Sequence, residues 1–324
     1  MGEDKAEWIK RVAVIGAGLM GHGIAQTFAA AGLEVNLTDT VPEVLKRAPV
    51  RIKDNLNLMA EAGRLSAERI PEIMARVVLQ PDLGRAVEGA DFVCESISEN
   101  LKAKQDLFAR LDAACPPRTI LTTNSSSLSL SQVGVRIARR DKLIATHFLN
   151  PPHIIPLVEV MPGGETSEEV LQTTVALMRR CGQAPVILKK EVPGYIFNRL
   201  LAALFREAMA LVGDGIAEVE DVDLAVKAGL GLRMPFMGLL ELADLAGLDL
   251  LEVALRNLIP LINSETTPPA VLSEKVKRGE LGGKTEKGFY DWRGRSVSDF
   301  IRWRDENVHR LRLAFWEGNR DGQS

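Results

Sequence analysis

Residues 11–39 read RVAVIGAGLMGHGIAQTFAAAGLEVNLTD, and this stretch decides the fold of the first part of the chain. Residues 11–15 are almost all apolar and partly β-branched, which is typical of a strand buried on both faces. A glycine-rich turn follows, then an alanine-rich segment with helical spacing that ends at Gly32, and then a second apolar run over residues 33–39. Strand, turn, helix and strand in this order predict a βαβ unit with a parallel sheet.

The turn between the first strand and the helix has the pattern G-x-G-x-x-G, formed by Gly16, Gly18 and Gly21 with Leu19 and Met20 inside it. The first glycine permits a tight turn, the second lets backbone approach a pyrophosphate, and the third lets the helix pack closely on the strand. The N-terminus of the helix then offers free N–H groups to phosphates. A glycine-rich turn alone is a weak signal, but its place between strand and helix favours dinucleotide binding.

Asp39 ends the second strand, where a carboxylate can accept hydrogen bonds from the hydroxyls of a ribose. A 2′-phosphate would meet this carboxylate with like-charge repulsion, and Thr40, Val41 and Pro42 supply no arginine to offset it. We therefore predict that the cofactor is NAD rather than NADP.

The sequence pattern of the remaining chain changes near Pro193. Residues 42–76 predict two helices broken near Ala62 and Gly63, and strands and helices then alternate. From Gly194 onward, apolar residues recur at helical spacing. We predict an α/β Rossmann domain over residues 1–190, with a doubly wound, mostly parallel sheet and a helical hairpin inserted near 42–76, followed by an all-α substrate and dimerisation domain over 191–324. Strands are predicted at residues 90–97, 119–123, 143–148 and 157–160, and a helix at 101–114.

Composition excludes several classes of protein. The 324 residues carry 40 Lys and Arg against 43 Asp and Glu, so the net charge of −3 gives no global positive field for nucleic acid. Cys94, Cys115 and Cys181 form no C-x-x-C pair, and none of the four histidines lies in an H-E-x-x-H motif, so we predict neither a disulfide framework nor a metal site. No apolar run approaches the ~18 residues that cross a bilayer, and the charged N-terminus is not a secretory signal, so we expect a cytoplasmic protein.

His147 is the best candidate for the general base that an NAD enzyme needs to oxidise an alcohol. It ends the apolar run LIATH, and an imidazole titrates near neutrality, so it can take and return a proton. Glu159 lies in the next apolar run, PLVEV, where a buried carboxylate needs a partner. Pairing with His147 would meet that need and orient the ring, but the spacing fits a purely structural pair, or two unrelated surface residues, equally well.

At this point the sequence resembles the L-3-hydroxyacyl-CoA dehydrogenase family along nearly its whole length. The matching stretches are VAVIGAGLMGHGIAQTFAAAG, ADFVCESISENLKAKQDLF, TTNSSSLSL, HFLNPPHIIPLVEV, VPGYIFNRLL, MGLLELADLAGLD and GGKTEKGFYDW. The resemblance implies NAD-dependent interconversion of a 3-hydroxyacyl compound and its 3-keto product, with His147 as base and Glu159 as its charge partner. It also implies a homodimer made largely through the C-terminal helices.

Other residues receive roles through this resemblance. Ser126 would bind the C3 oxygen of the substrate, and Asn198 would orient the substrate from the helical domain. Glu99 and Lys104 would lie near the nicotinamide and its ribose, and we assign Asn124 to the same cofactor site. Each has a plainer alternative: Ser126 as a turn residue, Asn198 as a partner of helix backbone, and Lys104 as part of a solvated helix face.

The substrate stays open between two classes. The hairpin VRIKDNLNLMAEAGRLSAER mixes acidic with basic residues, which is less basic than a surface that grips the phosphates of CoA. The loop NPPHIIP after His147 looks like the branch that acts on smaller free hydroxy acids or alcohols, namely the gulonate and lambda-crystallin group, carnitine dehydrogenase and pyridine-carboxylate dehydrogenases. Two non-enzymatic alternatives are a crystallin-like structural protein and an NAD sensor.

Overall fold

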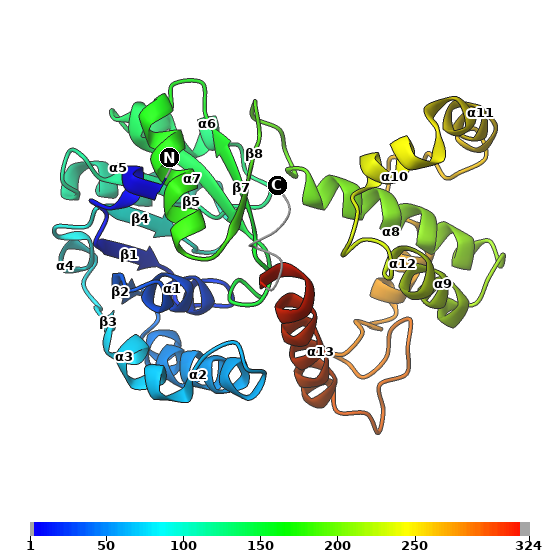
Figure 1. Cartoon of the computed structure of the whole chain (residues 1–324), viewed down its shortest axis with the longest axis horizontal. Helices are drawn as coiled ribbons and strands as arrows, with labels where there is room; N and C mark the ends of the chain where they lie inside the picture. The colour runs from blue at the N-terminus through cyan, green and yellow to red at the C-terminus, as the bar shows by residue number, and fades with distance from the viewer. Residues whose placement is uncertain (1–2, 318–324) are drawn as a thin grey trace. The chain divides into compact units, whose positions relative to one another are not determined.

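The computed structural model describes residues 3–317 and divides the chain into two compact units, one up to Ile196 and one from Phe197 (Figure 1). The first unit is a sheet covered by helices on both faces, and the second is helical. The predicted fold class, a Rossmann domain followed by an all-α domain, is therefore confirmed.

The first unit contains one eight-stranded sheet in the order β3-β2-β1-β4-β5-β6-β7-β8. Neighbouring strands run parallel except for β6 and β7, which are antiparallel. Two short strands, β3 and β8, are absent from the sequence predictions; they are three and four residues long and partly exposed. The strands are β1 (Arg11–Ile15), β2 (Glu34–Thr38), β3 (Val77–Leu79), β4 (Phe92–Glu95), β5 (Ile120–Thr123), β6 (Leu143–Phe148), β7 (Leu157–Pro162) and β8 (Ala184–Ile187).

Helices follow most strands and cover both faces of the sheet. The predicted hairpin is present, because α2 ends at Glu61 and α3 begins at Ile70. The predicted helix over 101–114 is α5, which begins where the Asn100 side chain accepts a hydrogen bond from the Ala103 N–H. The helices of this unit are α1 (Gly21–Ala30), α2 (Pro42–Glu61), α3 (Ile70–Ala75), α4 (Leu83–Val87), α5 (Leu101–Ala114), α6 (Leu130–Val133) and α7 (Glu168–Arg180).

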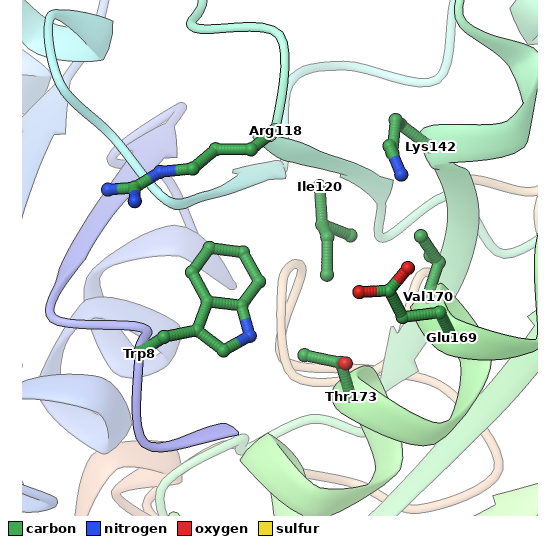
Figure 2. A pocket seen from close by; sticks show the side chains of 7 residues that line it. All are labelled: Trp8, Arg118, Ile120, Lys142, Glu169, Val170 and Thr173. Carbon is green, nitrogen blue, oxygen red and sulfur yellow. The ribbon is translucent and has the colours of Figure 1, made fainter. Parts of the chain in front are cut away.

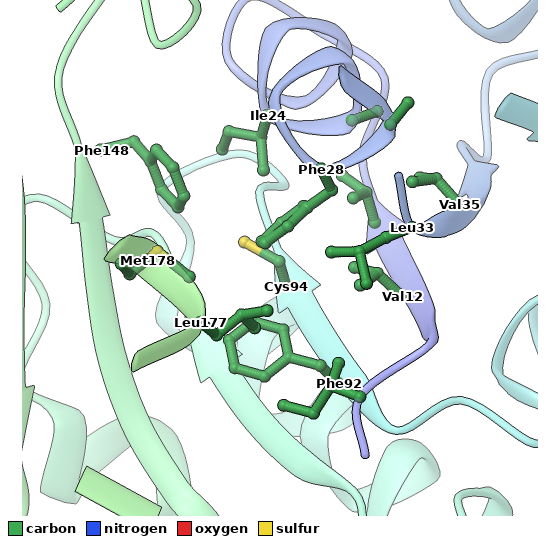
Figure 3. Packing of buried hydrophobic residues seen from close by; sticks show 14 of the residues in the cluster. Val12, Ile24, Phe28, Leu33, Val35, Phe92, Cys94, Phe148, Leu177 and Met178 are labelled. Atoms are coloured by element: carbon green, nitrogen blue, oxygen red, sulfur yellow. The ribbon is translucent and has the colours of Figure 1, made fainter. Parts of the chain in front are cut away.

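Alternate residues of the strands form two hydrophobic cores, one on each face of the sheet. Val12, Phe92 and Phe148 pack against α1 and α7, where Phe28 makes edge-on contacts with both phenylalanine rings (Figure 3). The opposite face packs against α5 and α6. Burial on both faces holds the strands rigidly, so the loops at their ends are supported for function.

The second unit consists of α8 (Phe197–Gly213), α9 (Val219–Ala225), α10 (Leu239–Ala246), α11 (Leu248–Leu258), α12 (Ala270–Lys277) and α13 (Val297–Leu311), with π-helical turns at Val226–Leu230 and Arg312–Glu317. Helices α8 to α12 are amphipathic, yet none of their described side chains is fully buried. Over residues 3–317, no helix combines the length and apolar character that a bilayer crossing requires.

Candidate active site

The glycine-rich turn joins β1 to α1 at the carboxyl edge of the sheet. Gly16 has a φ of +102°, a conformation that favours glycine, and its N–H donates to the Thr38 carbonyl at 2.8 Å. A Cβ at Gly21 would overlap the Gly16 carbonyl oxygen, whereas a Cβ at Gly18 would meet no atom within 4 Å. Gly16 and Gly21 therefore close the turn, and Gly18 leaves open space at the start of the helix.

A cavity of 680 Å³ lies beside this turn and is lined by Gly16, Gly18, Asp39 and Ser96 among others. Its volume is in the range of small-molecule sites. Asp39 is held in place because its two carboxylate oxygens accept from the Ala17 and Val41 N–H groups, each at 2.8 Å. Open backbone at a helix N-terminus, next to a fixed acid, fits the phosphates and ribose of a dinucleotide.

The other residues of the turn differ in exposure. The Leu19 side chain is 63% exposed, while Met20 packs against the core cluster that contains Phe28. The Gly18 carbonyl is bound by two residues that the sequence did not single out, His22 Nδ1 at 2.7 Å and Arg51 Nη1 at 3.3 Å. Burial lowers the pKa of His22, which favours the uncharged ring beside the turn.

His147 and Glu159 lie directly opposite each other on the antiparallel strands β6 and β7. His147 Nδ1 and Glu159 Oε2 are 2.8 Å apart, and both side chains are buried, so the contact expected from the sequence is present. Glu159 Oε1 accepts a second hydrogen bond, from the Ile196 N–H at 2.8 Å. Because both carboxylate oxygens are engaged, the carboxylate is fixed in orientation and holds one nitrogen of the imidazole ring.

The loop after β5 lies at the same edge of the sheet. Asn124 Oδ1 accepts from the Phe148 N–H at 2.7 Å, which ties this loop to the backbone beside His147. Ser125 Oγ and Ser127 Oγ donate to Glu99 at 2.6 and 2.8 Å. Ser126 lies between them and is exposed. The bonds to Glu99 thus come from the two neighbours of Ser126.

Lys104 is buried, so its alternative placement on a solvated helix face is wrong. Its Nζ lies 2.5 Å from Glu95 Oε1 and 3.5 Å from Glu99 Oε2. Burial raises the pKa of Glu99, but hydrogen bonds from Ser125 and Ser127 and the charge of Lys104 lower it more, to about 2. Lys104 therefore supports the carboxylate that holds the serine loop.

Three residues of this cluster carried no prediction from the sequence. Glu95 is fully buried at the end of β4, where its carboxylate accepts from Lys104 and from Thr123 Oγ1. Tyr195 stacks on the His147 ring, and Ser125 donates to Glu99. A charged residue within an apolar run, the signal used for Glu159, would have found Glu95 as well. Asn198 is the second residue of α8 and belongs to the second unit.

A second cavity, of 290 Å³, lies between Trp8, Lys142 and Glu169 (Figure 2). It includes Ile120, the first residue of β5, and therefore lies at the amino edge of the parallel strands, opposite the glycine turn. Arg118 at its rim packs over the Trp8 ring and binds Asp91 at 2.6 Å. Within residues 3–317, no cluster of three His, Cys, Asp or Glu side chains could hold a metal ion.

Comparison with known proteins identifies this arrangement. The family model of the NAD-binding domain of 3-hydroxyacyl-CoA dehydrogenase matches residues 11–192, and that of the C-terminal domain of the same family matches residues 194–292. A probable 3-hydroxybutyryl-CoA dehydrogenase of Bacillus subtilis is 39% identical over 288 residues, 88% of this chain and 98% of the relative. A lambda-crystallin homologue of Bos taurus is 40% identical over 71% of this chain and 72% of its own length.

A solved structure also matches both units. It is the 5-formyl-3-hydroxy-2-methylpyridine 4-carboxylic acid 5-dehydrogenase, an NAD⁺-dependent dismutase, with a TM-score of 0.88 and 30% identity over 98% of this chain and 100% of that chain. The N-terminal unit is an NAD-binding domain, so the predicted cofactor is confirmed. The chain belongs to the 3-hydroxyacyl-CoA dehydrogenase family.

Proposed function

We propose that this protein uses NAD to interconvert an L-3-hydroxyacyl-CoA compound and its 3-keto product, with His147 as the general base. The observation that carries the proposal is the buried His147–Glu159 pair, 2.8 Å apart, at the carboxyl end of β6. Strands β1, β4, β5 and β6 are parallel, so the glycine turn, the serine loop and His147 share one edge of the sheet. Ligands of open α/β sheets bind at this edge.

Each residue has a task in the proposed reaction. Glu159 accepts a hydrogen bond from the Nδ1–H of His147, which leaves Nε2 with a lone pair for the substrate hydroxyl, and its charge stabilises the imidazolium that forms. The exposed Ser126 hydroxyl holds the C3 oxygen, and Asn198 orients the substrate from the second unit. NAD, when bound along the Gly16–Gly21 turn and Asp39, supplies the acceptor for the hydride of C3.

A separate set of hydrogen bonds holds the residues that we assign to the cofactor. Glu99 is held as a carboxylate by Ser125, Ser127 and Lys104, at the edge where the nicotinamide ribose would lie. Asn124 fixes the serine loop to the strand that carries His147. These bonds hold the ribose-binding and proton-accepting groups in one rigid frame, which is what hydride transfer at a defined distance needs.

A smaller free hydroxy acid or alcohol is the second candidate substrate. The pyridine-carboxylate dehydrogenase structure matches 98% of this chain, including the stretch beyond residue 292 where the family models end. In the α2–α3 hairpin, Arg51 bonds the Gly18 carbonyl and Arg69 bonds the Ala30 carbonyl. Two basic side chains of the hairpin therefore already bond backbone carbonyls, which is an argument against their binding the phosphates of CoA.

A homodimer through the C-terminal helices is part of the proposal. Leu240, Leu245, Leu250 and Leu261 of the α10–α11 region are each at least 68% exposed. Exposed apolar side chains of this number on neighbouring helices are typical of a surface that a partner covers. A cytoplasmic location is proposed with it, since Cys94 and Cys115 are buried free thiols.

A substrate panel tests the proposal. Reduction of acetoacetyl-CoA and oxidation of 3-hydroxybutyrate, carnitine, gulonate and a pyridine alcohol are followed by NADH absorbance. Turnover with the thioester supports the first candidate, and turnover confined to free acids or alcohols supports the second. Tight NAD binding with no turnover of any compound would point to a sensor or structural protein. His147→Ala should lower kcat by at least about 10²-fold with NAD affinity retained, and Glu34→Gln, in an exposed ion pair with Arg11, serves as control.

A further inference from the structure

Tyr195 occupies an unusual place in the segment between β8 and α8. It is 2% exposed, although it lies in a connection rather than in a helix or strand. Its φ is +51°, directly after Gly194 at +80°. A bulky residue adopts this left-handed conformation rarely, and such residues persist where the surroundings hold them firmly. The contacts of Tyr195 explain what holds it.

Three contacts join this segment to the candidate active site. The Tyr195 ring stacks on the His147 imidazole, with 4.5 Å between centroids and 18° between planes. Its hydroxyl donates to the Ser125 carbonyl at 3.0 Å. The N–H of the next residue, Ile196, donates to Glu159 Oε1 at 2.8 Å. One two-residue segment therefore contacts the base, the carboxylate that orients it and the residue before Ser126.

We propose that Tyr195 is a positioning residue for the proton transfer at His147. The proposal rests on the function proposed above. The stacked phenol ring limits rotation of the imidazole, and its electron-rich face stabilises the imidazolium that forms when the base takes a proton. Through its hydroxyl, the same side chain fixes the Ser125 backbone. The base and the Ser126 hydroxyl are therefore held at fixed positions relative to each other.

The charged groups near the His147–Tyr195 stack come from several elements. Glu159 faces His147 from β7, and Tyr195 covers the ring from the segment after β8. Glu95, Glu99 and Glu191 are the other carboxylates whose charge acts on the tyrosine hydroxyl, and Lys104 pairs with the first two of these. Burial, and then these carboxylates, raise the pKa of Tyr195, so its hydroxyl stays a hydrogen-bond donor across the working pH range.

Two variants separate the ring from the hydroxyl. Tyr195→Phe keeps the stack and loses the bond to Ser125, so kcat should fall about two- to tenfold, the equivalent of one hydrogen bond, while the acid limb of the pH profile stays in place. Tyr195→Leu keeps the site apolar but removes the aromatic face. Its kcat should fall about 10- to 100-fold, and the acid limb should move to lower pH because the imidazolium loses a stabilising partner.

The control is Phe108→Leu, which shortens a buried aromatic side chain of α5 in the same core cluster. It should lower the melting temperature and leave the pH profile unchanged. A Tyr195→Leu enzyme with the kcat and acid limb of the Phe108→Leu control would overturn the proposal.

A second measurement does not depend on activity. In NMR spectra of the protein without substrate, the His147 ring protons should carry a ring-current shift that Tyr195→Phe retains and Tyr195→Leu loses. If no compound of the panel is turned over but this shift behaves as expected, the proposed function fails while the stack stands. If turnover is present and Tyr195→Leu leaves both the shift and the pH profile unchanged, the positioning role fails alone.

Discussion

Glu159→Gln is the sharpest test of the His147–Glu159 pair because it changes charge and hydrogen bonding with almost no change in shape. Both carboxylate oxygens accept from N–H donors at 2.8 Å, one on His147 and one on Ile196. An amide has a single acceptor oxygen, so either orientation of the glutamine places its NH₂ group against a former donor. If the NH₂ group faces His147, it donates to Nδ1 and moves the ring proton to Nε2, which then cannot act as base.

The magnitude follows from these contacts. Loss of one hydrogen bond at a buried group costs about 1–3 kcal/mol of unfolding free energy. Loss of the correct tautomer and of the charge that stabilises the imidazolium should cost about 10²–10⁴-fold in kcat, or about 3–5 kcal/mol at 1.36 kcal/mol for each factor of ten. Thermal melting measures the loss of stability and steady-state kinetics the loss of kcat, and NAD binding is measured beside them. The matched control is Glu34→Gln, which removes a carboxylate from an exposed ion pair with Arg11.

A Glu159→Gln enzyme with kcat within threefold of the wild type would refute this reasoning. It would mean that the pair is structural, the alternative that spacing alone left open, and that another group accepts the proton.

Three further predictions test the cofactor turn, the serine loop and the helical unit. Gly18→Ala should leave the melting temperature unchanged and weaken NAD binding, measured by calorimetry, about 10-fold or more, because a Cβ at residue 18 has open space. Gly21→Ala should unfold the domain, because a Cβ at residue 21 overlaps the Gly16 carbonyl oxygen. Glu99 has a folded pKa of about 2 against 4.5 for the free side chain, so its carboxylate stabilises the fold above pH 4.5, and this contribution is lost as the pH falls from 4.5 towards 2. Glu99→Gln should therefore lower the free energy of urea unfolding at pH 7 by about 1–2 kcal/mol, a figure reduced for solvent screening because the side chain is 35% exposed. The loss at pH 4 should be smaller, and equal losses at both pH values would contradict the assignment. Leu240→Asp combined with Leu261→Asp should shift the protein from dimer to monomer in analytical ultracentrifugation, and an unchanged sedimentation coefficient would place the dimer contact elsewhere.

The secondary-structure elements with a signal in their own segment could be predicted from the sequence. The first βαβ unit, the hairpin break near Gly63 and α5 each have a periodicity or a cap within the segment itself. The short strands β3 and β8 have neither, and the sheet fixes them through hydrogen bonds to β2 and β7. Pairing with neighbouring strands, and not the local sequence pattern, therefore determines these two strands.

The same distinction explains the candidate site. Gly16, Gly21 and Asp39 could be placed because a turn and the end of a strand define their geometry. Lys104 could not, because its burial depends on Glu95, a residue on a different element that folding brings to within 2.5 Å. A lysine on an amphipathic helix is normally solvated, and a buried carboxylate partner is the specific circumstance that reverses this expectation.

The His147–Glu159 contact lies between these two cases. Each residue is a polar group in an apolar strand, which predicts burial with a partner, but the partner is fixed only by the antiparallel register of β6 and β7. A shift of that register by one residue would turn Glu159 to the other face of the sheet. The loop between the strands sets the register, and Ile154 and Ile155 both donate backbone hydrogen bonds to the Pro151 carbonyl to define its turn. The proline-rich loop after His147 is therefore as necessary to the pair as its two side chains, because its length determines which residue of β7 faces the histidine.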